Sequence, residues 1–108
     1  MSADPIVGRH LMWTFDNGQM KGKTFEHTFD ADGTVHFRCT TDSKMTGSAK
    51  YEIGRLNDNV YVISYRVDGG FTLTTVLDLK TGTLVSMSSN DKQLDKQTGT
   101  FEMAKHAA

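Results

Sequence analysis

Apolar and polar residues alternate along most of this chain, in short stretches separated by turn residues. In the stretch 71–79, FTLTTVLDL, the odd-numbered residues are mostly apolar and the even-numbered residues are mostly polar. A period of two residues is typical of a β-strand that buries one of its faces. This stretch therefore predicts a strand on which Phe71, Leu73 and Leu77 share an apolar face.

The same alternation, or a run of β-branched and aromatic residues, predicts about eight strands along the chain. The expected strands cover residues 10–15, 23–29, 34–40, 50–56, 60–67, 71–79, 83–89 and 99–103. Residues 89–96, SNDKQLDK, form the one segment that is expected to hold a helical turn or a long loop.

Turn residues separate the predicted strands at intervals of about a dozen residues, as is typical of antiparallel hairpins. The turn clusters lie at 16–18, 30–33, 57–59, 68–70 and 80–82. Because an open meander of this many strands would leave two unpaired edges, closure into a barrel is favoured. The sequence thus predicts one all-β domain over residues 1–108, a small antiparallel up-and-down β-barrel with room for one small ligand.

Length and composition narrow the class of protein further. A chain of 108 residues fits one domain, and its 12 basic and 13 acidic side chains, with a net charge of -1, form no patch for nucleic acid or an anionic membrane. The single cysteine, Cys39, excludes an internal disulfide and is typical of a reducing compartment. No signal peptide or membrane span is visible. We expect a cytoplasmic protein with a small-molecule partner.

Few side chains offer recognisable chemistry. The four histidines lack metal-binding spacings, and no phosphate-cradling or dinucleotide motif is present, so neither a metal nor a cofactor is predicted. His27 shares a strand face with Phe25 and Phe29, which indicates either a hydrogen-bonded core histidine or a group facing the barrel interior. Cys39 is expected to be buried and inert.

The stretch 60–67, VYVISYRV, has two faces of different chemistry, and alternation does not choose between them. If Tyr61 and Tyr65 face the interior, they add hydroxyl groups to a pocket. If the other face is inside, Arg66 could anchor a carboxylate. Trp13 and Phe15 share a face of the first strand and are expected to form either a pocket wall or plain core.

Several motifs resemble known families. The segments GRHLMWTFDNG, HTFDADGTVHFR and VYVISY are similar to the bacterial phenolic acid decarboxylases. Together with TTVLDLKTGTLVS, they resemble the small MoaF-like proteins more closely. The resemblance covers roughly Gly8 to Ser89 and implies a lipocalin-like barrel of the calycin type, in a group whose members commonly dimerise.

The resemblance also indicates which activity is lost. In the decarboxylases, two alternating tyrosines hold the substrate carboxylate, and an arginine and a glutamate lie in the lumen. These positions correspond to Trp13, Phe15, a residue near Lys50, and Val67. Phe15 cannot donate a hydrogen bond, Lys50 lacks the planar grip of arginine, and Val67 cannot transfer a proton. Phenolic acid decarboxylation is therefore not expected.

Three hypotheses of function follow. The first is a barrel that binds a compact apolar or aromatic molecule through Trp13, Phe15, Phe25, His27, Phe37, Lys50, Tyr51, Tyr65 and Arg66. The second is an enzyme acting on a small metabolite, an isomerase, cyclase or lyase, with acid-base groups among His27, His36, Arg38, Lys50 and Glu52. The third is a barrel filled by its own side chains that acts in self-association.

Overall fold

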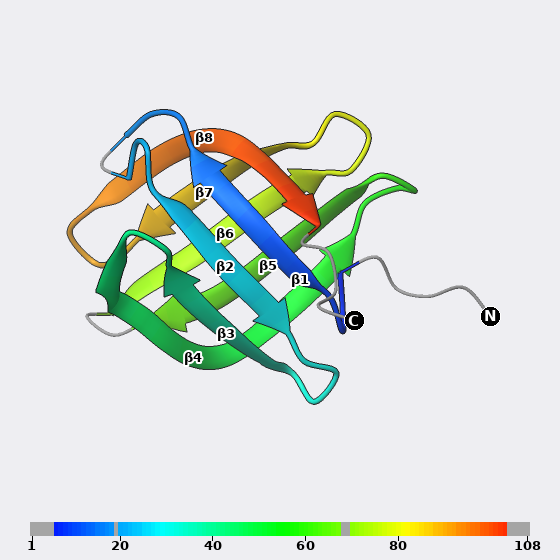
Figure 1. The fold of residues 1–108 in the computed structure, drawn as a ribbon, viewed down its shortest axis with the longest axis horizontal. Helices are drawn as coiled ribbons and strands as arrows, with labels where there is room; N and C mark the ends of the chain where they lie inside the picture. Colours follow the sequence, from blue (N-terminus) through cyan, green and yellow to red (C-terminus); the bar gives the residue numbers. More distant parts are fainter. Residues whose placement is uncertain (1–5, 19, 68–69, 104–108) are drawn as a thin grey trace.

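The computed structural model describes residues 6–18, 20–67 and 70–103, and these form a closed barrel of antiparallel strands in chain order (Figure 1). The strands are β1 (His10–Phe15), β2 (Thr24–Phe29), β3 (Thr34–Cys39), β4 (Asp42–Arg55), β5 (Val60–Val67), β6 (Phe71–Asp78), β7 (Thr83–Ser89) and β8 (Leu94–Met103). The predicted eight-stranded up-and-down barrel is confirmed. Part of the expected 68–70 turn lies outside the described residues. In the described ranges, no helix is long and apolar enough to cross a membrane.

The barrel closes where β8 pairs with β1, and glycine is required at this seam. Gly99 lies opposite Phe15 in the register. A Cβ atom at position 99 would lie 2.1 Å from the carbonyl oxygen of Thr14, so any side chain would displace the backbone of β1. Beyond the end of β1, the Thr98 hydroxyl donates to the Asp16 carboxylate at 2.6 Å. The seam therefore depends on a close backbone approach, reinforced by a side-chain hydrogen bond.

Two strands are longer than the sequence pattern predicts. β4 begins at Asp42 rather than at residue 50, and β8 begins at Leu94 rather than at residue 99. The helical turn or long loop expected within 89–96 is wrong. Residues 90–93 form a short hairpin turn in which Asn90 Oδ1 accepts from the N–H groups of Lys92 and Gln93. Both missed segments are rich in polar residues, which hid their alternation.

Gly47 explains part of the weak pattern in β4. It faces Phe37 across the β3–β4 pair, and a Cβ atom there would lie 2.9 Å from Cζ of the Phe37 ring. The Phe37 ring from the neighbouring strand thus fills the space where an inward-facing side chain of residue 47 would lie. An apolar residue that would reveal the alternation is therefore missing from this position.

The interior has two halves. The closed half, at the end where β1 begins, is filled by fully buried apolar side chains: Ile6, Leu11, Phe29, Val35, Ile63 and Leu77. Ile6 precedes the barrel, and its segment is fixed by the Gly8 N–H, which donates to the Phe29 carbonyl oxygen at 2.6 Å. The opposite end, which we call the open half, contains a cavity.

Candidate ligand-binding cavity

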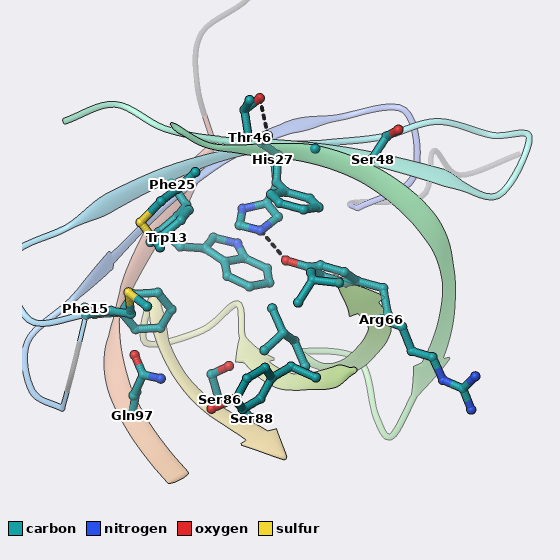
Figure 2. Close-up of a pocket in the computed structure, with 18 of the residues that line it drawn as sticks. Trp13, Phe15, Phe25, His27, Thr46, Ser48, Arg66, Ser86, Ser88 and Gln97 are labelled. Carbon is teal, nitrogen blue, oxygen red and sulfur yellow. Dashed lines mark hydrogen bonds between the residues drawn. The ribbon is translucent and has the colours of Figure 1, made fainter. Parts of the chain in front are cut away.

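A cavity of about 450 Å³ occupies the open half, at the end where β1, β3, β5 and β7 finish. This volume lies within the roughly 300–1,000 Å³ typical of small-molecule sites. Its aromatic lining consists of Trp13, Phe15, Phe25, His27, Phe37, Tyr65 and Phe71. Figure 2 labels the first four of these side chains. Alternation in the strands places these side chains on inward faces, because successive residues of a strand point to opposite sides of the barrel.

The aromatic rings pack against one another around the cavity. Trp13 stacks on His27 with ring centroids 3.8 Å apart, and Phe37 stacks on Tyr65 at 5.6 Å. Nearer the mouth, Phe15 meets Phe25 edge to face at 5.9 Å. Such ring pairs add roughly 0.5–1.5 kcal/mol each beyond the area they bury. They form a continuous wall, which we call the aromatic wall, from β1, β2, β3 and β5.

His27 lies at the boundary between the two halves and is held by Tyr65. The His27 Nε2 atom and the Tyr65 hydroxyl are 2.8 Å apart, within a buried hydrogen bond. Burial lowers the pKa of His27 from 6.5 to about 3, against an opposing effect of the Phe25 backbone. Burial likewise raises the pKa of the Tyr65 phenol. Both groups are therefore neutral at physiological pH, with Tyr65 the natural donor and Nε2 the acceptor.

A second wall of the cavity is polar, and we call it the polar strip: Ser86 and Ser88 of β7 and Gln97 of β8 (Figure 2). The Ser86 hydroxyl pairs with the Thr75 hydroxyl at 2.9 Å. Gln97 is only 7% exposed, and its Oε1 atom has no hydrogen-bond partner among the described residues. Unpaired buried polar atoms of this kind cost free energy unless another group satisfies them.

Three charged side chains belong to the cavity lining, and none of them is fully buried. Lys44 and Arg66 are exposed, whereas Asp95 is half-buried on the inward face of β8, opposite Ser88. Figure 2 shows the Arg66 side chain extending away from the aromatic rings. The inward face of β5 is therefore the one that carries Tyr61, Ile63 and Tyr65, which settles the choice that alternation left open.

Of the nine residues expected to bind a ligand, six line the cavity together: Trp13, Phe15, Phe25, His27, Phe37 and Tyr65. Arg66 is at its mouth. Lys50 and Tyr51 are not part of the lining. Lys50 is exposed, opposite Thr34 in the β3–β4 register, because alternation turns it outward once β4 starts at Asp42. Tyr51 is buried in the closed half, where its hydroxyl donates to the Asp30 carbonyl oxygen at 2.8 Å.

Most of the acid-base candidates of the enzyme hypothesis also lie outside the lumen. His36, Arg38 and Glu52 are exposed on the outer surface. His36 contacts the Asp30 carboxylate at 2.9 Å, and Arg38 donates to the Glu26 carboxylate at 2.5 Å. These are cross-strand and turn contacts of the outer face, so an expectation that they share one internal site is wrong. Within the described ranges, no cluster of three metal-ligating side chains occurs.

The polar strip was missed by sequence reasoning. Leu84, Ser86 and Ser88 alternate with exposed residues along β7, so the pattern contained the signal. Serine is ambiguous, however, because it is found on either face of a strand. Gln97 was missed for a different reason, namely that the last strand was expected to begin at residue 99, whereas β8 begins at Leu94.

The fold and this site define a small closed β-barrel with a ligand-sized cavity open at one end. Residues 1–93 match the MoaF N-terminal domain, and the chain belongs to that family. It is similar in fold to a crystal structure from Burkholderia vietnamiensis described as a "putative beta-lactamase", with a TM-score of 0.77 and 18% identity over 96% of this chain and 100% of that one. No curated protein matches the chain.

Proposed function

We propose that this protein binds a compact, largely aromatic molecule in the cavity of the open half. The observation that carries the proposal is a cavity of about 450 Å³ walled by stacked aromatic rings. The closed half shows that these strands can fill an interior completely, with Ile63 and Leu77 at 0% exposure. Space kept open among aromatic side chains is typical of small-molecule sites.

One observation favours the enzyme hypothesis, namely the hydrogen bond between His27 and Tyr65 in the lumen. A general base works best when its pKa lies near the operating pH. The pKa of His27 is lowered to about 3, and its Nε2 atom is already bonded to Tyr65, so it is a weak base at neutral pH. The pair is better suited to holding the wall in place than to moving a proton.

The name of the structural neighbour does not change this conclusion, since at 18% identity the likeness concerns the fold. Acyl transfer by a serine needs a base within hydrogen-bond reach of the hydroxyl. The Ser86 hydroxyl is bonded to Thr75, which cannot act as one. Binding is therefore the function that the cavity supports best.

Tryptophan emission tests the proposal directly, because Trp13 is the one tryptophan of the chain and part of the aromatic wall. A panel of two-ring aromatic compounds should quench or shift its emission and raise Tm. Ser88→Phe places a ring into the cavity and should weaken binding at least tenfold. Met87→Phe, on the neighbouring outward position, should change Kd less than twofold. Unchanged emission and unchanged Tm across the panel would contradict the proposal.

A further inference from the structure

The cavity has two walls of opposite character, which restricts the chemistry of its ligand beyond being aromatic. The aromatic wall comes from β1, β2, β3 and β5, and the polar strip comes from β7 and β8 (Figure 2). We propose, on the basis of the function proposed above, that the ligand is a planar molecule that has no negative charge and has one hydrogen-bonding edge. Its ring face packs on Trp13 and Phe37, and a hydroxyl, carbonyl or amide group meets Ser88 and Gln97.

The polar strip has hydrogen-bonding capacity that the described residues leave unused. Gln97 Oε1 has no partner, although the side chain is more than nine-tenths buried. A half-turn of the amide exchanges its oxygen and nitrogen, so Gln97 can offer either an acceptor or two donors to the cavity. The Ser86 hydroxyl already forms one hydrogen bond, with the Thr75 hydroxyl. A ligand with a hydroxyl or amide group would satisfy these atoms, whereas a pure hydrocarbon would bury them unpaired.

The aromatic wall and the polar strip consist of uncharged side chains, and this selects against anions. Among the described lining residues, the inward-facing titratable side chains are His27, Tyr65 and Asp95. Burial keeps His27 and Tyr65 neutral. The two cationic lining residues, Lys44 and Arg66, are exposed, and the acidic Asp95 lies opposite Ser88 in the β7–β8 register. A carboxylate group that reached the polar strip would lose its hydration without gaining a counter-charge, which costs free energy. The cavity should thus discriminate by charge as well as by shape.

A matched set of naphthalene derivatives tests the inference, because its members share one ring and differ in one substituent. We would measure Kd by isothermal titration calorimetry for naphthalene, 2-naphthol, 2-naphthamide and 2-naphthoate. We expect 2-naphthol and 2-naphthamide to bind at least tenfold more tightly than naphthalene, and at least tenfold more tightly than 2-naphthoate.

Two variants assign the preference to the polar strip. Gln97→Leu keeps similar bulk but removes the amide, and Ser88→Ala removes one hydroxyl. In each variant, 2-naphthol should bind only about threefold more tightly than naphthalene, or less, while naphthalene itself still binds. Lys96→Gln, at an exposed position beside Gln97, should leave the ratio unchanged.

The outcomes separate this inference from the proposed function. Equal binding of naphthalene and 2-naphthol, or tightest binding of 2-naphthoate, would leave a binding protein but overturn the inference about its ligand. A preference for 2-naphthol that survives both variants would overturn it as well, because the polar strip would not be its source. Failure of all four compounds to bind would overturn both proposals together.

Discussion

The same strands run through both halves of the barrel, but the interior of the closed half is packed and the interior of the open half contains the cavity. On β6, Leu77 is 0% exposed in the closed half, whereas Leu73 on the same face is partly buried and lines the cavity. On β2, Phe29 is in the packed core and Phe25 is in the aromatic wall. Alternation therefore decides which face of a strand is inside, but position along the strand decides whether the side chain packs or lines open space.

The two halves should also differ in how much they contribute to the free energy of unfolding. Fully packed side chains contribute most of the stability of a small domain, and removing one leaves a gap that its neighbours fill only in part. Side chains around an existing cavity have fewer contacts to lose. The closed half should thus act as the stable base of the molecule, and the open half should tolerate substitution with effects mainly on binding.

Lowering the pH should destabilise the protein at His27, the boundary between the two halves. We expect this to be the largest of the predicted effects on the free energy of unfolding. Above pH 6.5 His27 is neutral in both the folded and the unfolded chain, so its contribution to stability is fully present. Below pH 6.5 the unfolded chain takes up a proton that the folded chain does not accept until about pH 3. Stability should therefore fall over this window, by up to about 5 kcal/mol.

Urea unfolding of the wild type and of His27→Gln, measured from pH 7 to pH 4, isolates this effect, because the carboxylates are common to both proteins. The free energy of unfolding of the wild type should fall more steeply. NMR of the imidazole should show His27 still neutral at pH 5. A midpoint for His27 near 6.5 would mean that the boundary is open to water.

A pair of leucines on β6 tests the comparison itself. Leu77→Ala in the closed half should lower the free energy of unfolding by about 3 kcal/mol, as expected for a fully buried leucine. Leu73→Ala in the open half should lower it by only about 1 kcal/mol, because the cavity already deprives this side chain of contacts. Urea titration at one pH compares the two directly, and equal losses would contradict the division into halves.

A smaller effect than that of Leu77→Ala should come from the hydrogen bond between His27 and Tyr65. Tyr65→Phe keeps the ring that stacks on Phe37 but leaves His27 Nε2 without its donor. The cost should be about 1–2 kcal/mol, the usual result of leaving a buried acceptor unpaired. The measurement is again urea unfolding at neutral pH. An unchanged midpoint would indicate that His27 finds another donor, and the pair would then not define the boundary.

Much of the fold could be predicted from sequence, because turn residues and alternation are local signals. The hairpins and the inward faces of β1, β2 and β6 follow from them. The site could be predicted only in part. The aromatic wall was found because large rings on one face stand out, but Lys50 and Tyr51 were misplaced, since the start of β4 depends on its pairing with β3. Ser86, Ser88 and Gln97 were missed because small polar residues give no directional signal.

The seam at Gly99 also affects the order in which the binding site can form. β1 and β8 lie at opposite ends of the chain, so Phe15 and Gly99 must meet across nearly the whole sequence. Such distant pairings carry the largest loop-closure entropy, so we expect this one to form late in folding. Trp13 and Phe15 belong to β1, while Gln97 belongs to β8. The two walls of the cavity therefore come together only when the barrel closes. A ligand that contacts both walls would then stabilise the pairing of β1 with β8.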